Sequence, residues 1–373
     1  MESFYRLTAR TEELFSLLQD EKSRRLFWDR LKCDVHPTVE NVADLYADGF
    51  DLDDEQRREQ KQLSEIVRKL HQEGKRLLLY GAGGCGNAIA EILLVSGIPF
   101  DGFCDKKAAT LKEVKGKPVY SPEHLFFHKE EFCVIVAVET HYDQIMDLLR
   151  RNAFPENQIL PYFVSRPANE VYFEFPQFYR PGTAFVDGGC FDGETSRSFA
   201  KWCGGQYSKI FALEPDEENA KLIRDKLASN PIERFQLYQA GLSCRDGEAT
   251  FMSMSGASSY ISGGEADGRF SYDHKEITGH CVSIPLISLD SMVGDDEVGF
   301  IKLDIEGAEL DALMGSEKTL QRDKPFLAIC IYHRQGDMLS IMDYLNKVVP
   351  EYRFWIRHYA ALQVDTVLYA AVP

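Results

Sequence analysis

Two acidic residues in the second half of the chain follow neighbouring apolar segments, in positions that suit ligand binding. Asp187 opens the glycine-rich turn DGGCFDG at residues 187–193, and Glu214 follows the apolar run at 210–213. Glycines let the backbone approach a ligand closely, and a carboxylate beside the turn favours a ligand that carries positive charge. The two carboxylate oxygens of Glu214 can accept hydrogen bonds from both hydroxyls of a ribose. S-adenosylmethionine fits this pattern, because it joins a cationic amino-acid end and a sulfonium to a ribose.

A third candidate segment is IKLDIEGAE at residues 301–309. We expect Asp304 at the C-terminal end of a strand, where the crevice of an open α/β sheet binds its ligands. Lys302 lies inside an otherwise apolar strand, which is costly unless an acid pairs with it, and Asp304 or Glu306 is the natural partner. The segment therefore predicts a set of charged groups beside the ligand site.

Methyl transfer from a sulfonium to an oxygen needs a base, and two residues are candidates for it. His333 follows another expected strand and has an ordinary pKa close to neutrality, and Asp304 borders the crevice. A surface histidine beside Arg334 is the alternative interpretation of His333. Asp304, Glu306, Glu309 and His333 also suit an oxygen-rich metal site, but no ligand spacing requires one, so we assign no metal ligand.

Another glycine-rich turn lies in the first half of the chain. Gly81, Gly83 and Gly86 follow the apolar run at 76–80 and open a helical pattern, and Asp105 ends the next expected strand. This is the layout of a dinucleotide site, in which helix N–H groups meet a phosphate and the acid binds ribose hydroxyls. The alternative is that the glycines only allow the helix to pack on the strand. No group of residues suited to hydride transfer follows this turn.

Three regions of different character must position these residues. Residues 1–72 are polar with apolar residues at helical spacing, which predicts a helical extension. Residues 73–167 and 168–373 each alternate apolar strands with helices, which is typical of parallel sheets covered on both faces. The fold class is therefore α/β, with two Rossmann-like sheets in tandem. In the second sheet we expect strands at 184–187, 210–214, 235–239, 300–304 and 326–331, followed by a pair at 352–357 and 364–370 that can be antiparallel.

The composition bounds the partners and the compartment. The 373 residues include 42 Lys and Arg and 59 Asp and Glu, which give a net charge of −17. A field of this sign repels phosphate, so we expect neither nucleic acid nor an anionic membrane as a partner. Nine scattered cysteines, no signal peptide and no apolar run of membrane-spanning length favour a reducing, cytoplasmic location. The composition leaves open whether the chain forms a homo-oligomer.

In the region of about 180–372 the sequence resembles the FkbM family of S-adenosylmethionine-dependent methyltransferases. The segments VDGGCFDGET, FALEPD, ISLDSM and IKLDIEGAE occur in the family's order. The resemblance implies a class I methyltransferase fold, which is a mostly parallel seven-stranded sheet with an antiparallel last strand. It also implies an enzyme that methylates hydroxyl groups of sugars or other small metabolites. The segment GKPVYSPE at 116–123 resembles part of the small Rossmann-like domain of sugar-modifying enzymes, which binds a nucleotide-sugar or serves only in packing.

Carried over to this sequence, the resemblance implies that Asp187, Gly189 and Gly193 hold the methionine end of the cofactor. Glu214 then holds the ribose, and the segment at 304–306 borders the methyl-transfer site. The full set of expected cofactor-binding residues is Asp187, Gly188, Gly189, Gly193, Glu214, Pro215, Ala240 and Asp304. The expected catalytic residues are Asp304, Glu306 and His333.

The chain departs from the family's pattern in two places. The loop after the third strand reads QAGLS at 239–243 where the family commonly has a polar residue before an Ala-Leu pair, and Cys330 occupies a position that is frequently acidic. A Ser- and Gly-rich stretch between the third and fourth strands is our hypothesis for a lid over the acceptor, and a disordered insertion is the alternative. This stretch runs from Ser253 to Arg269, with Tyr272, His274 and Lys275 after it.

Three classes of function remain open at this point. We favour a methyltransferase that acts on an oxygen of a small-molecule acceptor, such as a sugar or a nucleotide-sugar. The second class is an NAD(P)-dependent oxidoreductase that uses the turn at 81–86, for which we find no downstream catalytic acid or Tyr-Lys pair. The third class is a non-catalytic sensor of a nucleotide or nucleotide-sugar that retains a cofactor pocket.

Overall fold

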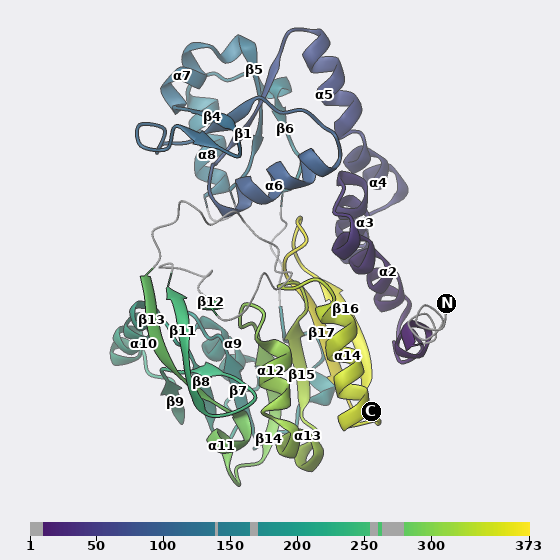
Figure 1. Cartoon of the computed structure of the whole chain (residues 1–373), viewed down its shortest axis with the longest axis vertical. Helices are drawn as coiled ribbons and strands as arrows, with labels where there is room; N and C mark the ends of the chain where they lie inside the picture. The colour runs from purple at the N-terminus through teal and green to yellow at the C-terminus, as the bar shows by residue number, and fades with distance from the viewer. Residues whose placement is uncertain (1–9, 139–140, 165–170, 254–259, 263–279) are drawn as a thin grey trace. The chain divides into compact units, whose positions relative to one another are not determined.

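The computed structural model describes residues 10–138, 141–164, 171–253, 260–262 and 280–373. The chain forms two compact units (Figure 1). The N-terminal unit comprises Trp28–Ala168 and His358–Val364. The C-terminal unit comprises Asn169–Arg357 and Asp365–Pro373, together with the described part of Met1–Phe27.

The polar region before the first sheet is helical, as its apolar spacing predicts. Asp53 accepts hydrogen bonds from the N–H groups of Glu55 and Gln56 and caps a helix that buries none of its residues, so the charged segment at 54–61 is a solvated helix. Within the described ranges, no helix combines the length and apolar character needed to cross a lipid bilayer. The helices of this region are α2 (Glu21–Val35), α3 (Val39–Gly49), α4 (Asp54–Lys61) and α5 (Leu63–Gln72).

The N-terminal unit contains a six-stranded sheet with the order β3-β4-β2-β1-β5-β6. The pairs β1–β2, β1–β5, β2–β4 and β5–β6 are parallel, and the β3–β4 pair is antiparallel. Strands β1 and β5 are almost entirely buried, which explains their continuous apolar sequences. The elements are β1 (Arg76–Tyr80), α6 (Gly84–Val95), β2 (Gly102–Cys104), β3 (Glu113–Val114), β4 (Lys117–Tyr120), α7 (Pro122–Phe127), β5 (Phe132–Val136), α8 (Tyr142–Arg151) and β6 (Ile159–Leu160).

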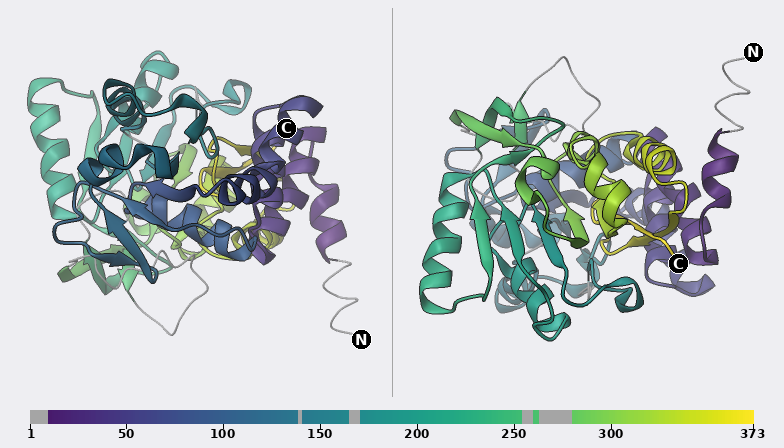
Figure 2. Two further views of the ribbon diagram at one scale, coloured as in Figure 1. Left: turned by 90° about the horizontal axis from the view of Figure 1, so that it is seen from above. Right: turned by 90° about the horizontal axis from the view of Figure 1, so that it is seen from below.

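The C-terminal unit contains a seven-stranded sheet with the order β16-β17-β15-β14-β7-β8-β9. Strand β17 is antiparallel to β15, and the five central and edge strands from β15 to β9 are parallel. Figure 2 shows helices on both faces of this sheet. The expected α/β class, with two mostly parallel sheets and an antiparallel last strand, is confirmed. The strands are β7 (Ala184–Gly188), β8 (Ile210–Leu213), β9 (Phe235–Tyr238), β14 (Val298–Leu303), β15 (Phe326–Cys330), β16 (Arg353–His358) and β17 (Thr366–Ala371).

Helices connect the strands of this second sheet. They include α9 (Glu194–Trp202), α10 (Glu217–Ser229), α11 (Leu289–Val293), α12 (Glu309–Met314), α13 (Glu317–Asp323) and α14 (Asp337–Val348). Asp216 caps α10 by accepting hydrogen bonds from the N–H groups of Glu218 and Asn219. This cap starts the helix directly after β8 and so holds Glu214 at the end of the sheet.

The segment that connects β9 to β14 in the sequence forms a separate four-stranded sheet, which was not expected. Its order is β10-β13-β11-β12, and β11 pairs with β13 in antiparallel register. Most of the hypothetical lid at 253–269, and Tyr272, His274 and Lys275, lie outside the described residues. The strands are β10 (Gly241–Leu242), β11 (Gly247–Ser253), β12 (Tyr260–Ser262) and β13 (His280–Ile287).

Candidate functional site

A cavity of about 230 Å³ lies in the C-terminal unit where β7, β8 and β14 end. One water molecule in the liquid occupies about 30 Å³, so the cavity is several times larger than a water molecule and can hold part of a larger ligand. Its wall combines turns after three parallel strands with residues that follow β9 and one residue of β11. The lining residues are Gly189, Cys190, Phe191, Asp192, Thr195, Leu213, Glu214, Pro215, Asn219, Ala240, Gly241, Leu242, Phe251, Lys302, Asp304, Ile305, Glu306 and Ala308.

Asp187 does not reach the cavity wall, because its side chain is fully buried beneath the turn. Its Oδ1 lies 3.2 Å from Lys302 Nζ, and its Oδ2 accepts a hydrogen bond of 2.7 Å from Ser196. The partner of Lys302 is therefore Asp187, and the expectation of Asp304 or Glu306 in this place is wrong. Register explains the difference, since parallel β7 and β14 place Lys302 directly beside Asp187.

Lys302 also fastens the glycine-rich turn. Its ammonium donates hydrogen bonds to the carbonyl oxygens of Gly188 at 3.0 Å and Gly189 at 2.7 Å. Burial acts to lower the pKa of Lys302, but the negative charges of Asp187 and Asp304 outweigh burial and hold the pKa above its ordinary value. The lysine is thus a permanent positive charge at the cavity wall.

Gly189 allows the turns after β7 and β14 to approach each other. Its φ is +73°, and a Cβ at this position would lie 1.8 Å from the carbonyl oxygen of Asp304. No other residue type fits such a contact without a backbone shift. Gly193, with a φ of +81°, precedes the first turn of α9 and, like Gly188, lies outside the cavity wall.

Glu214 presents a buried carboxylate to the cavity, with only 6% of its surface exposed. Its Oε2 accepts a hydrogen bond of 3.0 Å from the N–H of Phe191, and its Oε1 accepts one of 3.0 Å from the N–H of Asp216. Asn219 adds a side-chain contact of 3.4 Å to Oε1. Burial raises the pKa of Glu214 to about 7, although the hydrogen bonds from Asp216 and Asn219 favour the ionised form.

Asp304 also lines the cavity, and two tyrosines form hydrogen bonds with its carboxylate. Its Oδ2 accepts a hydrogen bond of 2.9 Å from the hydroxyl of Tyr172, and its Oδ1 accepts one of 3.1 Å from the hydroxyl of Tyr332. Desolvation acts to raise the pKa of Asp304, but the positive charges of Lys302 and His333 outweigh it and leave the pKa below its ordinary value. Asp304 is therefore an ionised carboxylate that its neighbours hold in one orientation.

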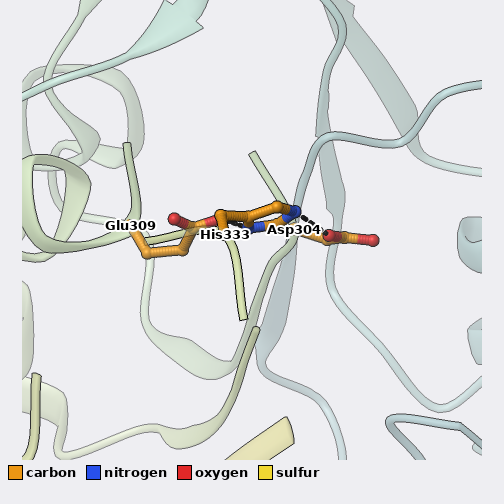
Figure 3. A group of neighbouring side chains, drawn as sticks. All are labelled: Asp304, Glu309 and His333. Carbon is orange, nitrogen blue, oxygen red and sulfur yellow. Dashed lines mark ion pairs between the residues drawn. The ribbon is translucent and has the colours of Figure 1, made fainter. Parts of the chain in front are cut away.

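His333 lies behind Asp304, outside the cavity wall, with 7% of its side chain exposed. Its Nδ1 is 2.9 Å from Glu309 Oε1, and its Nε2 is 3.4 Å from Asp304 Oδ1 and 3.6 Å from Glu306 Oε2. Figure 3 shows the ring with the Glu309 carboxylate on one side and Asp304 on the other. Burial acts to lower the pKa of His333, but Glu309 and the two further carboxylates raise it to about 10. With only these neighbours, the imidazole is protonated at neutral pH.

The sequence-based site residues separate into two groups. Those on the cavity wall are Gly189, Glu214, Pro215, Ala240, Asp304 and Glu306, whereas Asp187, Gly188, Gly193 and His333 are not among the lining residues. Sequence reasoning missed Phe251, because the strand that carries it was not expected. It also missed Tyr172 and Tyr332, whose hydroxyls reach Asp304 from segments distant in sequence.

The glycine-rich turn of the N-terminal unit is held together by its own acid. Asp105 Oδ2 accepts a hydrogen bond of 3.0 Å from the N–H of Ala82, and Oδ1 accepts one of 2.8 Å from the N–H of Lys107. A Cβ on Gly86 would lie 2.0 Å from the carbonyl oxygen of Gly81, whereas a Cβ on Gly83 would meet no atom within 4 Å. Close packing of α6 on the turn therefore accounts for Gly86, and close packing of the turn on the residues after β5 accounts for Gly81, but neither accounts for Gly83.

Residues 187–355 match the family model described as the methyltransferase FkbM domain. The C-terminal unit carries an FkbM methyltransferase domain. The resemblance that the sequence motifs indicated is thus confirmed, and the FkbM domain contains every residue of the cavity wall.

Relatives of known name extend this comparison. The 2-O-methyltransferase NoeI of Sinorhizobium fredii (strain NBRC 101917 / NGR234) is 25% identical over 162 residues, which are 39% of this chain and 62% of NoeI. The chain thus matches less than two thirds of the length of that relative. A crystal structure of a methyltransferase FkbM from Methylobacillus flagellatus KT is 17% identical with a TM-score of 0.47, and the match covers 82% of this chain and 93% of that chain. A SAM-dependent methyltransferase from Aquifex aeolicus is 12% identical with a TM-score of 0.30, over 53% of this chain and 87% of that chain.

Proposed function

We propose that the FkbM domain transfers a methyl group from S-adenosylmethionine to a hydroxyl oxygen of a small acceptor such as a sugar. The observation that carries this proposal is the buried Glu214 carboxylate on the cavity wall, beside the glycine-rich turn at Gly189. The name of the relative NoeI, a 2-O-methyltransferase, supports oxygen as the acceptor atom.

The cavity residues fit the chemistry of this cofactor. Glu214 Oε2 accepts one backbone N–H and keeps a further lone pair for a ribose hydroxyl. Oε1 accepts a backbone N–H and the long 3.4 Å contact from Asn219, and a second ribose hydroxyl would take the place of that contact. Leu242 and Phe251 offer the apolar surface that an adenine ring needs. Gly189 and Asp192 line the part of the wall that would hold the methionine end. This assignment replaces Asp187, whose charge Lys302 already neutralises.

The reaction needs an acceptor oxygen in line with the methyl carbon and a group that takes the hydroxyl proton. When bound, S-adenosylmethionine supplies an electrophilic methyl group: an O–C bond forms, the C–S bond breaks, and its electron pair stays on the sulfur of S-adenosylhomocysteine. The hydroxyl becomes strongly acidic as its oxygen bonds to the methyl carbon, so an ionised carboxylate suffices as the proton acceptor. Asp304 is the ionised carboxylate of the wall that hydrogen bonds hold in place, with Glu306 beside it and His333 behind it.

Calorimetric titration of the full chain with S-adenosylhomocysteine tests this proposal. We expect binding to the wild type, and we expect Glu214→Ala to weaken it at least tenfold, because the ribose hydroxyls lose their acceptor. The matched control is Glu217→Ala, which removes an exposed carboxylate from the first turn of α10. NAD and a nucleotide-sugar are titrated in parallel. Absence of S-adenosylhomocysteine binding, or equal affinity in Glu214→Ala and the wild type, would refute the proposal.

A further inference from the structure

Acidic side chains at one edge of the cavity wall and the histidine behind them have the spacing of ligands around one cation. Asp304, Glu309 and His333 each offer one ligand atom, and these atoms all lie within 4.8 Å of one another. His333 Nε2 is 3.4 Å from Asp304 Oδ1 and 3.6 Å from Glu306 Oε2. Both distances exceed the roughly 2.7–3.2 Å of a hydrogen bond. Two ligands bonded at about 2.1 Å to a tetrahedral ion lie about 3.4 Å apart, which agrees with the observed separations.

The same side chains contain buried polar atoms that the protein does not satisfy. His333 Nε2 has no hydrogen-bond partner among the described residues, and neither has Glu309 Oε2, whereas His333 Nδ1 is paired with Glu309 Oε1 at 2.9 Å. The side chains of His333 and Glu309 are 7% and 1% exposed. Buried imidazole and carboxylate groups are costly when they are not satisfied. An ion beside Nε2 would remove this cost for the histidine.

Glu309 has the position of an outer partner that orients a metal-binding histidine. Its Oε1 lies 2.9 Å from His333 Nδ1 and accepts a hydrogen bond of 2.8 Å from the N–H of Ile305, which fixes the carboxylate. A carboxylate beside Nδ1 keeps the proton on that nitrogen and leaves the Nε2 lone pair for an ion. Nε2 is the nitrogen that faces Asp304 and Glu306, and both of these acids line the cavity.

We infer that His333 Nε2, Asp304 and Glu306 bind one divalent cation at the edge of the cavity, and that Glu309 orients the histidine. The mixture of imidazole and carboxylate ligands suits Mn²⁺ or Zn²⁺ better than Ca²⁺ or Mg²⁺, which favour oxygen ligands alone. Three protein ligands leave further coordination positions toward the cavity for water or for an acceptor oxygen.

This site deepens the proposed function, and its role in catalysis rests on that function. An acceptor hydroxyl bound to the ion would lose its proton to solvent water more readily, because the cation stabilises the oxygen anion. The oxygen would then form the O–C bond while the C–S electron pair moves to sulfur. The ion would thus replace Asp304 as the group that activates the acceptor.

Binding of Mn²⁺ to the chelator-treated full chain, followed by electron paramagnetic resonance of the free ion, tests the site without any methyl donor or acceptor. We expect one bound Mn²⁺ per chain, displaced by Zn²⁺ and not by an equal concentration of Ca²⁺. Glu306→Gln and His333→Gln should each weaken Mn²⁺ binding at least tenfold, and Glu309→Gln should weaken it by about 10- to 100-fold. Glu217→Gln, the same change on an exposed helix position, should leave the affinity unchanged.

Two results would overturn the inference. One is the absence of stoichiometric Mn²⁺ and Zn²⁺ binding to the wild type, and the other is equal Mn²⁺ affinity in the wild type, Glu306→Gln and His333→Gln. Thermal unfolding of each variant shows whether it is folded. S-adenosylhomocysteine binding without an ion site refutes the ion alone, whereas an ion site without S-adenosylhomocysteine binding refutes the proposed function alone.

Discussion

The two glycine-rich turns of this chain have similar backbone contacts but differ in the charged residues around them. In each turn a glycine approaches a neighbouring strand end, since a Cβ on Gly81 would lie 2.5 Å from the carbonyl oxygen of Ala137 and one on Gly189 would lie 1.8 Å from that of Asp304. In each, an acid after the next strand accepts a hydrogen bond of 3.0 Å from a turn N–H: Asp105 from Ala82, and Glu214 from Phe191.

The difference lies in what surrounds this common frame. Below the turn of the C-terminal unit, Lys302 and Asp187 form a fully buried ion pair, and the acid of the next strand faces a cavity. The turn of the N-terminal unit follows the apolar strand β1. The glycines therefore indicate close packing in both units, and the charged residues around a turn are what indicate a ligand-binding site.

The largest expected effect comes from breaking the buried ion pair. Lys302→Met leaves the Asp187 carboxyl group without its ion-pair partner in a fully buried position, which should lower the free energy of unfolding by about 3–5 kcal/mol. Unfolding of the full chain by guanidinium measures this loss. Lys347→Met, which removes a surface cation with 67% of its side chain exposed, is the control and should cost less than about 1 kcal/mol. A cost for Lys302→Met similar to that of the control would mean that the pair does not hold the turn.

The second prediction compares one glycine from each turn. Gly189→Ala introduces a contact with Asp304 at a positive φ and should lower stability by about 2–4 kcal/mol and abolish S-adenosylhomocysteine binding. Gly83→Ala meets no atom and has a φ of −85°, so its effect on stability should stay within about 0.5 kcal/mol. Chemical unfolding and calorimetry provide both readouts. A large loss of stability in Gly83→Ala would remove the distinction between the two turns.

The third prediction uses the raised pKa of Glu214, which lies at about 7 because of burial. Hydroxyl groups donate hydrogen bonds to the ionised carboxylate, and the ionised fraction rises from about one tenth at pH 6 to about nine tenths at pH 8. S-adenosylhomocysteine should therefore bind about tenfold more tightly at pH 8 than at pH 6, with release of a proton at the lower pH. Calorimetry in buffers of different ionisation enthalpy measures both quantities. Glu214→Gln should bind weakly and without this pH dependence, and an unchanged pH profile in that variant would assign the titration to another group.

The comparison also shows which parts of the structure local sequence patterns determine. The strands at 184–188, 210–213 and 326–330 were predicted to within one residue, because each is a buried apolar run bounded by turn residues. The partner of Lys302 was not predictable in this way. It depends on β14 lying next to β7, a strand order that no local pattern determines.

The same reason explains the other omissions at the site. Phe251 belongs to β11, a strand whose sequence GEATFMS lacks the continuous apolar character of the buried parallel strands. The tyrosines at 172 and 332 are distant in sequence and contact Asp304 only in the tertiary structure. The acids of the site can be predicted from the sequence, because parallel strands place their C-terminal ends at one edge of the sheet. The residues that pair with these acids can be identified only from the tertiary structure.

The smallest expected effect concerns Asp105, the acid that corresponds to Glu214 in the N-terminal unit. Asp105→Ala removes the acceptor for the N–H groups of Ala82 and Lys107 at a partly exposed position, which should lower the free energy of unfolding by about 1 kcal/mol. S-adenosylhomocysteine affinity should not change, because all the residues that line the cavity belong to the other unit. Asp105→Asn keeps one oxygen acceptor and should lose less stability than the alanine variant. If the wild type binds NAD or a nucleotide-sugar and Asp105→Ala loses this binding without a loss of stability, Asp105 binds a ligand in the manner proposed for Glu214. Both turns would then bind a ligand, and they would differ only in which ligand they bind.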